Sequence, residues 1–288
     1  MTTRTRPGIK GRGSTGYLPG RFAVTTPDAI DDGWHDADTE GDPSSSPQTE
    51  LHEEVARSVI TRNSSPDIPF EQSLNPYRGC EHGCSYCFAR PSHAYLDLSP
   101  GLDFETRIFA KTNAPQILRQ ELSKRGYRPS PISLGINTDA YQPVERGLRI
   151  TRQCLEVLHE CRHPVGIITK SALIERDLDL LKPMADANLV AAAVTITTLD
   201  HSISRTLEPR AASPTRRLQL VETLAKALTA MVGKPEHPIQ VIGTRHGEKL
   251  FEALLSREEM ACAEDMGEYF RVPPDLRDLN YSKFVEQG

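Results

Sequence analysis

The stretch that decides the fold of this chain reads Asn75-Pro-Tyr-Arg-Gly-Cys80-Glu-His-Gly-Cys84-Ser-Tyr-Cys87. Its three cysteines have the spacing C-x3-C-x2-C. Thiolates are preferred ligands of soft centres such as zinc and iron–sulfur clusters. Three thiolates on a cubane cluster leave one iron without a protein ligand, where a substrate or cofactor can bind. Gly79 and Gly83 allow the backbone to wrap closely around the metal.

A structural zinc site is the alternative explanation of this triplet. The ligand set would be Cys3His, with His82 or His93 as the fourth ligand. Zinc sites usually combine two short cysteine motifs, and this chain has a single triplet. The spacing therefore favours an iron–sulfur cluster over zinc.

Strand and helix patterns alternate downstream of the triplet. Apolar runs predict buried strands at 131–136, 165–169 and 189–199. Helical spacing of apolar residues predicts helices between and after them, over about 113–126, 150–161, 178–184 and 218–228. This order implies right-handed parallel crossovers, and hence an α/β fold with a parallel (β/α) barrel or partial barrel.

Four segments of this pattern end at the expected catalytic rim, because parallel barrels carry their chemistry at the C-terminal ends of the strands. They are the cysteine loop, 137–139, Lys170 and 197–198. Their convergence is stronger evidence for a site than any one of them.

The chain divides into three parts by composition and pattern. Residues 1–50 are rich in Gly, Pro, Ser, Thr and Asp, which predicts a disordered leader. Residues 11–16 match G-x-G-x-x-G but lack the flanking strand and helix of a dinucleotide site. We predict a truncated barrel over 51–227. Over 228–288 we expect a small α+β appendage with a strand at 239–242 and a helix at 250–255.

Bulk properties restrict the class of protein further. The net charge of −5 offers no argument for nucleic-acid binding through bulk electrostatics. No apolar run is long enough to span a bilayer, and the N-terminus lacks the apolar core of a secretory signal. Without export, tight cysteine spacing favours metal binding over disulfides. We therefore expect a cytoplasmic protein that does not contact a membrane.

The other three cysteines are not expected to bind metal. Cys154 and Cys161 follow the apolar face of a predicted helix, which indicates core residues. Cys262 lies outside the barrel pattern and is read as incidental.

The triplet and its surroundings resemble the radical SAM superfamily, whose motif is C-x3-C-x-aromatic-C, with Tyr86 as the aromatic residue. Residues 57–223 are similar to an uncharacterised bacterial subfamily related to spore photoproduct lyase. The segments that carry the similarity are Asn75–Cys80, Phe88–Tyr95, Asn137–Pro143, Thr169–Ser171 and Leu207–Arg210.

This resemblance implies a cofactor and a reaction class. A [4Fe–4S] cluster would be held by Cys80, Cys84 and Cys87, and the amine and carboxylate of S-adenosylmethionine would bind its open iron. An electron, supplied by a reductant protein such as a flavodoxin or ferredoxin, would release a 5′-deoxyadenosyl radical that abstracts a substrate hydrogen. Kinship alone suggests a nucleic-acid lesion as substrate.

Polar groups at the strand ends are the candidate cofactor ligands, together with Tyr86 of the motif. Asn137, Thr138 and Asp139 offer atoms suited to the methionine amine. Lys170 would pair with the methionine carboxylate as a point charge, unless it is a solvated strand-end lysine.

Two further segments are weighed beside these groups. Thr195 and Thr197 share one face of a predicted strand and would reach the ribose hydroxyls, although strand propensity also explains threonines there. Arg210, in Glu208-Pro-Arg210, would meet a substrate carboxylate or phosphate, or else anchor a loop. We assign no catalytic residue.

The last sixty residues resemble a different family, the C-terminal part of nucleoside-diphosphate-sugar 4,6-dehydratases and epimerases of polysaccharide biosynthesis. The similarity lies in Val232–Glu252 and Arg271–Tyr281. On that analogy Arg245 would meet the diphosphate. Because none of the eight tyrosines begins a Tyr-x3-Lys motif, we do not expect dehydratase or epimerase activity.

Three hypotheses follow. The first is an S-adenosylmethionine-dependent radical enzyme with a truncated barrel that lacks the fifth and sixth strands. The second is a fusion product that binds a cluster but is catalytically impaired. The third is a sugar-nucleotide-binding remnant with a structural cysteine site.

Overall fold

The computed structural model describes residues 9, 11–20, 47–65, 68, 70–231, 236, 257–267 and 270–272. The chain divides into two compact units, residues 1–237 and 238–288. In the second unit the described residues form α8 (Arg257–Cys262) and an antiparallel pair, β9 (Glu264–Asp265) and β10 (Phe270–Arg271). They make up a small α+β appendage, as predicted. The strand predicted at 239–242 and the helix predicted at 250–255 lie outside the described residues.

A five-stranded sheet forms the centre of the first unit, in the order β2-β3-β6-β7-β8. β3, β6, β7 and β8 are parallel, and only β2 is antiparallel to its neighbour. The bounds are β2 Ile60–Arg62, β3 Gln72–Leu74, β6 Ile132–Leu134, β7 Val165–Thr169 and β8 Val190–Val194. Four parallel strands joined by helical crossovers confirm the predicted partial (β/α) barrel.

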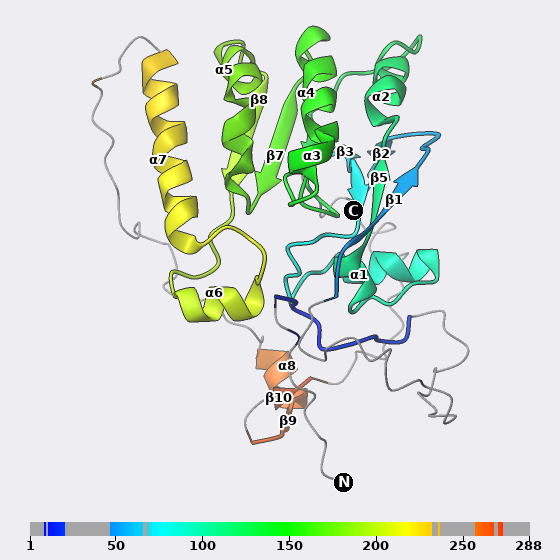
Figure 1. Cartoon of the computed structure of the whole chain (residues 1–288), viewed down its shortest axis with the longest axis vertical. Helices are drawn as coiled ribbons and strands as arrows, with labels where there is room; N and C mark the ends of the chain where they lie inside the picture. The colour runs from blue at the N-terminus through cyan, green and yellow to red at the C-terminus, as the bar shows by residue number, and fades with distance from the viewer. Residues whose placement is uncertain are drawn as a thin grey trace, which may run out of the picture. The chain divides into compact units, whose positions relative to one another are not determined.

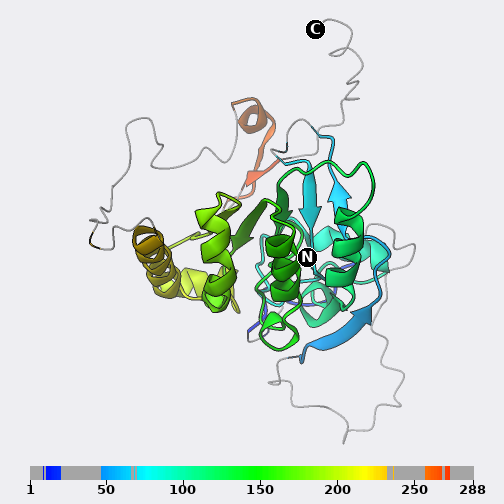
Figure 2. The same cartoon turned by 90° about the horizontal axis from the view of Figure 1, so that it is seen from above.

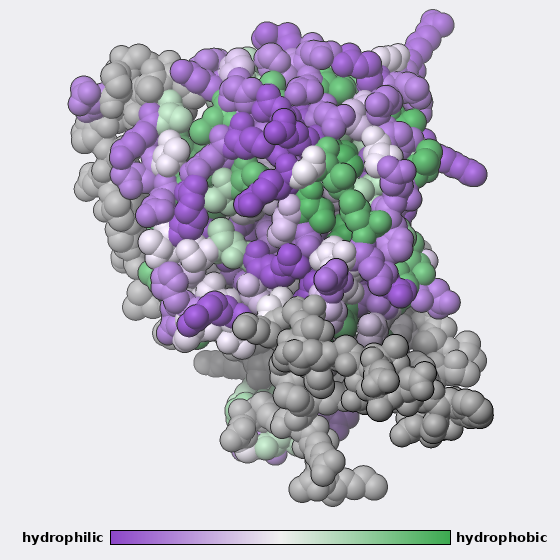
Figure 3. All heavy atoms as spheres, viewed as in Figure 1, coloured by the Kyte–Doolittle hydropathy of each residue, from purple (hydrophilic) through white to green (hydrophobic). Residues whose placement is uncertain are grey.

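Four helices lie on one side of this sheet (Figures 1 and 2). They are α2 (Ala114–Leu122), α4 (Ile150–Glu160), α5 (Leu178–Asp186) and α7 (Pro214–Met231). Their outer face is mainly hydrophilic, with apolar side chains gathered in patches (Figure 3). None of the described helices is long and apolar enough to cross a membrane.

Apolar side chains from sheet and helices make one core. In α4 the apolar positions recur with helical period, so the residues of one stripe are buried. Full burial of one such side chain contributes about 1.5–3 kcal/mol. The fully buried members include Leu74, Leu118, Ile132, Leu134, Leu155, Leu158 and Ile167.

A second, three-stranded sheet is formed by residues before and after the cysteine loop. β5 (Arg107–Lys111) pairs in parallel with β1 (Glu50–Glu54) and antiparallel with β4 (Tyr77–Arg78). Its sequence signal is weak, because the exposed β1, Glu-Leu-His-Glu-Glu, has low strand propensity. Between β4 and β5 the chain also forms the short helices η1 (Arg90–Leu96) and α1 (Asp103–Thr106).

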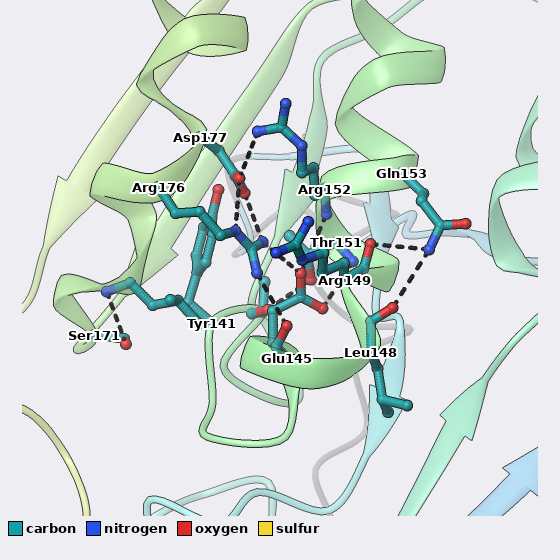
Figure 4. A network of polar contacts seen from close by, with 12 residues as sticks. Tyr141, Glu145, Leu148, Arg149, Thr151, Arg152, Gln153, Ser171, Arg176 and Asp177 are labelled. Atoms are coloured by element: carbon teal, nitrogen blue, oxygen red, sulfur yellow. Dashed lines mark hydrogen bonds and ion pairs between the residues drawn. The ribbon is translucent and has the colours of Figure 1, made fainter.

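A buried ionic network holds the helical layer together (Figure 4). Its centre is Glu145 at the start of α3 (Glu145–Leu148), and the side chain is fully buried. The carboxylate accepts hydrogen bonds from the Tyr77 hydroxyl, from the Thr151 N–H at 3.0 Å and from Arg176 of η2 (Ala172–Asp177) at 2.7 Å. This network links β4, which leads into the cysteine loop, to the crossovers after β6 and β7.

Two local expectations are corrected. The strand predicted over 189–199 ends at Val194, and Ala191, Ala192 and Ala193 are exposed, because among the described residues no strand pairs with the free edge of β8. Cys154 is buried as predicted. Cys161 is exposed, because it follows the last turn of α4 and leaves the apolar stripe.

The segment 11–20 also differs from the predicted disordered leader. Arg12 is buried and donates to the Glu105 carbonyl oxygen at 2.9 Å. The Gly13 N–H donates to the Glu105 carboxylate at 3.0 Å, and a Cβ atom at Gly13 would lie 1.8 Å from the Gly83 oxygen. Tertiary contacts with the cysteine loop thus order a segment that has no apolar periodicity.

The boundary predicted between residues 227 and 228 falls inside α7.

Candidate active site at the strand ends

A cavity of about 460 Å³ opens at the C-terminal ends of β6 and β7, beside the cysteine loop. It is lined by groups from three of the four predicted rim segments, which confirms that the topology brings them together. The candidate residues among its lining are Cys80, Cys84, Cys87, Asn137, Thr138, Asp139, Lys170 and Thr195.

The cysteine loop follows directly from β4 and is held by its backbone. The Cys80 N–H donates to the Phe104 carbonyl at 2.9 Å, and the Cys87 N–H donates to the Cys84 carbonyl at 3.2 Å. Gly79 and Gly83 have φ of 78° and 64°, the left-handed region that favours glycine. The two glycines therefore shape the loop as predicted.

The three thiols are free and face the same cavity. Cys80 and Cys84 are buried and Cys87 is half-buried. Burial raises the pKa of Cys84 to about 12, with a contribution from the neighbouring Cys80, whereas the Lys170 ammonium opposes this shift. Burial also raises the pKa of Cys87. The Cys84 and Cys87 thiols are therefore protonated without metal, and ligation must release their protons.

The thiol donors of the cysteine loop suit a cubane cluster. Within the described part of the chain, no group of three or more His, Cys, Asp or Glu side chains is arranged to hold one metal ion. The thiolates of a cubane each bind a different iron, so they need not converge on one point. Three free thiols on one loop meet that requirement.

The two histidines weighed as a fourth zinc ligand have protein partners, although His82 lines the cavity. His82 Nδ1 lies 3.3 Å from Asp139 Oδ2. Burial alone would lower the pKa of His82, but the Asp139 carboxylate raises it to about 10. A metal ligand must be neutral imidazole, so this pairing disfavours ligation. His93 does not line the cavity, and its Nε2 lies 3.0 Å from the Arg107 carbonyl.

Asp139 joins two strand ends at the cavity wall. Its carboxylate accepts the Thr169 hydroxyl at 2.7 Å and the Lys170 N–H at 2.7 Å. Burial by itself would raise the pKa of Asp139, but His82 and these hydrogen bonds hold it at about 2. The carboxylate is thus ionised and fully engaged by protein groups.

The two residues before Asp139 differ in what they offer to a ligand. The Asn137 N–H donates to the Asn75 side chain at 2.9 Å, and the exposed Asn137 side chain lines the cavity. The buried Thr138 hydroxyl donates to the Gly79 carbonyl at 2.6 Å. Thr138 therefore holds the entry to the cysteine loop.

Lys170 and Tyr86 are neighbours. The Lys170 Nζ lies 5.7 Å from the centre of the Tyr86 ring, within cation–π distance. Among the described residues no carboxylate pairs with this ammonium group. Tyr86 does not line the cavity; its hydroxyl donates to Glu208.

Thr195 and Thr197 do not share the strand face that was predicted, because β8 ends at Val194. Thr195 lines the cavity, and its N–H donates to the Thr169 carbonyl at 3.0 Å. The Thr197 hydroxyl donates to Glu208 at 2.6 Å, and Thr197 is not part of the cavity lining.

Arg210 anchors a loop, one of the two roles weighed for it. The Arg210 guanidinium lies 3.2 Å from the buried Glu81 carboxylate. The backbone N–H of Arg210 donates to the His82 carbonyl at 3.3 Å. Arg245 lies outside the described residues.

Sequence reasoning missed three groups that order the site. Glu208 was noted only as the neighbour of Arg210, although a glutamate inside a shared motif is a signal for a specific contact. Arg217 of α7 and the pair Arg90–Glu105 carry no local signal. Arg90 donates to the Cys84 carbonyl at 2.9 Å, so the pair supports the cysteine loop.

Residues 74–240, more than half of the chain, match the Radical SAM superfamily, and the chain therefore belongs to this superfamily. Residues 207–274 match the family described as Polysaccharide biosynthesis protein. Both resemblances seen in the sequence are thus confirmed. The two matches overlap over 207–240, a range that contains α7.

Relatives exist for each part. Proteins of uncharacterised function from Mycobacterium tuberculosis and Mycobacterium bovis are 34% identical over 205 residues, which cover 67% of this chain. The chain spans about 60% of the length of these relatives. A UDP-glucose 4-epimerase of Rickettsia bellii is 54% identical over 68 residues, covering 24% of this chain and 20% of the epimerase.

Solved structures of spore photoproduct lyase, including one complexed with dinucleoside spore photoproduct, are similar to the chain with a TM-score of 0.44. They are 16% identical, and the similar region covers 62% of this chain and 48% of the lyase.

Proposed function

We propose that the chain is an S-adenosylmethionine-dependent radical enzyme whose [4Fe–4S] cluster is held by Cys80, Cys84 and Cys87. One observation carries the proposal: the three free thiols share a single cavity with Asn137 and Lys170 at the strand ends. When bound, the reduced cluster supplies the electron that splits the S–C5′ bond of S-adenosylmethionine and releases a 5′-deoxyadenosyl radical.

The residues of the cavity have separate roles in this proposal. The Lys170 ammonium, which pairs with no described carboxylate, attracts the carboxylate of the methionine moiety. Asn137 and Thr195 also line the cavity, where the Asn137 side chain would bind the methionine amine and Thr195 the ribose. Thr138 and Asp139 act indirectly, because their oxygens hold the cysteine loop and the end of β7.

Two partners belong to the same proposal. A flavodoxin or ferredoxin would deliver the electron in the cytoplasm, and the substrate would be a nucleic-acid lesion. Membership of the Radical SAM superfamily supports a reductant protein of this class as the electron donor. Damaged and undamaged oligonucleotides, supplied to the reconstituted enzyme, would test the substrate directly.

Anaerobic reconstitution with iron and sulfide, followed by reduction with S-adenosylmethionine, tests the main proposal. We expect about four irons per chain, loss of visible absorbance in Cys80→Ala, Cys84→Ala and Cys87→Ala, and formation of 5′-deoxyadenosine. Cys161→Ala is the control, because this thiol is exposed and outside the cavity. A cluster without cofactor cleavage supports an impaired enzyme. Zinc at one ion per chain contradicts the proposal.

A second candidate function rests on the C-terminal match. We infer that residues around Arg245 retain affinity for a nucleotide sugar, on the basis of the identity to a UDP-glucose 4-epimerase. Calorimetry with UDP-glucose on the full chain and on Arg245→Ala tests it. Binding that is equal in the two proteins, or absent from both, contradicts it.

A further inference from the structure

We infer that Glu208 is a positioning residue of the cofactor site, acting through Tyr86 on the ammonium group of Lys170. The inference rests on the proposed binding of S-adenosylmethionine in the cavity. It assigns a role to a side chain that does not line the cavity.

Glu208 collects hydrogen bonds from three separate parts of the chain. Only 2% of the residue is exposed. One carboxylate oxygen accepts the Tyr86 hydroxyl and, at 2.6 Å, the Thr197 hydroxyl. The other oxygen forms an ion pair with Arg217 of α7. The cysteine loop, the segment after β8 and α7 are therefore joined at one carboxylate.

Arg217 makes this junction rigid. The side chain is 1% exposed, and each of its nitrogens has an acceptor. Its Nη1 donates to the Thr195 carbonyl at 3.0 Å and its Nε to the Ala212 carbonyl at 2.7 Å. A buried pair whose hydrogen-bonding groups are all satisfied favours one arrangement over alternatives. The Glu208 carboxylate therefore has a single position from which to hold Tyr86.

The backbone keeps the same two segments side by side. The Ser85 N–H donates to the Leu207 carbonyl at 2.9 Å, next to Tyr86 and Glu208 in the sequence. The Arg210 N–H donates to the His82 carbonyl at 3.3 Å. The contact between Tyr86 and Glu208 is thus part of a longer seam between the cysteine loop and residues 207–210.

Tyr86 transmits the position of Glu208 to the cavity. The residue is 48% exposed, so packing alone does not fix its ring. Lys170 Nζ lies 5.7 Å from the ring centre and has no carboxylate partner among the described residues. The ring is therefore the partner through which this ammonium group is oriented, and Lys170 itself lines the cavity.

A positioning role predicts a defect in cofactor affinity with an intact cluster. In Glu208→Gln and Tyr86→Phe we expect wild-type iron and sulfide content but a Kd for S-adenosylmethionine weakened about tenfold or more, as is typical when the support of a ligand is removed. Glu208→Asp should recover part of the affinity. The double variant of Glu208→Gln and Tyr86→Phe should bind S-adenosylmethionine no more weakly than Glu208→Gln alone. Both changes break the same chain of contacts.

The control and a second measurement separate this role from a general loss of stability. Glu175→Gln removes the carboxylate partner of Arg216, the residue before Arg217, and should leave the affinity unchanged. Hydrogen exchange of the metal-free protein should accelerate in residues 81–90 in Glu208→Gln and Tyr86→Phe, but not in Glu175→Gln.

An unchanged Kd together with unchanged exchange at 81–90 overturns the inference, as does an equal loss of affinity in Glu175→Gln. If Glu208→Gln does not fold, Tyr86→Phe alone decides, because it leaves the pair of Glu208 and Arg217 intact. If the wild-type protein binds no S-adenosylmethionine, the proposed function has failed. Exchange of the metal-free protein then still tests whether Glu208 orders the loop.

Discussion

The carboxylate of Asp139 accepts the backbone N–H of Lys170 at 2.7 Å and thereby ties the end of β6 to the end of β7. The same carboxylate lies 3.3 Å from the His82 imidazole, inside the cysteine loop. A single side chain thus sets the relative position of the cysteine loop and of Lys170, the lysine proposed to bind the cofactor. Asp139 therefore lines the cavity and also fixes the two segments beside it.

Asp139→Asn should destabilise the metal-free protein. The substitution removes the buried carboxylate that pairs with His82 and one acceptor for the Lys170 N–H. Breaking a buried pair from one side costs about 3–5 kcal/mol. Urea denaturation measures the loss, with Asp186→Asn on the exposed end of α5 as the control. Equal stability of the two variants would contradict the assigned role.

Glu145→Gln should also cost about 3 kcal/mol of unfolding free energy, because Arg176 and the Tyr77 hydroxyl lose the carboxylate that they share. The matched control is Glu156→Gln, which breaks an exposed i,i+4 pair with Arg152 on α4. Exposed pairs contribute less than about 1 kcal/mol. Chemical denaturation of both variants checks the difference, and a loss below 1 kcal/mol in Glu145→Gln is the opposing result.

Gly13→Ala should detach the segment 11–20 from the cysteine loop. The added Cβ would lie 1.8 Å from the Gly83 carbonyl oxygen, a backbone atom that cannot move aside cheaply. Overpacking of this kind costs about 1–3 kcal/mol. Hydrogen exchange should accelerate at 11–20 and at 81–85. Gly147→Ala in α3 meets nothing within 4 Å and should instead stabilise by about 0.4–1 kcal/mol. Unchanged exchange in Gly13→Ala would disprove the packing.

Glu121 should contribute to the acid sensitivity of the fold. Burial by itself raises its pKa, but hydrogen bonds from the Ser58 hydroxyl and the N–H groups of Ile60 and Val59 hold the pKa below 4.5. A carboxyl group whose pKa is lower in the folded protein stabilises the fold at pH values above its pKa in the unfolded chain. This stabilisation is lost as the pH falls through the pKa of the group in the folded protein. As the pH is lowered below about 4.5, the unfolding free energy of Glu121→Gln should therefore fall less steeply than that of the wild-type protein. Parallel slopes in the two proteins would rule the contribution out.

The parts of the fold with a periodic sequence signal were predicted well. β7 has its predicted bounds, and β6, α2, α4 and α5 lie within four residues of theirs, because each buries one apolar face against the common core. β1 and the segment 11–20 were missed. Both are polar, and both are ordered by pairing with residues far away in the chain.

The clustering of the candidate residues was predicted to a similar extent, whereas their roles stay predictions. The three cysteines, Asn137 and Lys170 line one cavity, because parallel strands bring their C-terminal ends to one rim. Thr197 was placed wrongly, since the strand that would have carried it ends three residues earlier.

The sequence by itself determined the superfamily, the cysteine triplet and the parallel order of the sheet, because spacing and periodicity are local properties. Only the tertiary structure decided which side chains hold these groups in place. Asp139, Glu208 and Arg217 act across more than fifty residues of chain or through contacts that no pattern announces. Their roles arise because a buried charge must find a partner, and folding alone determines which partner is near.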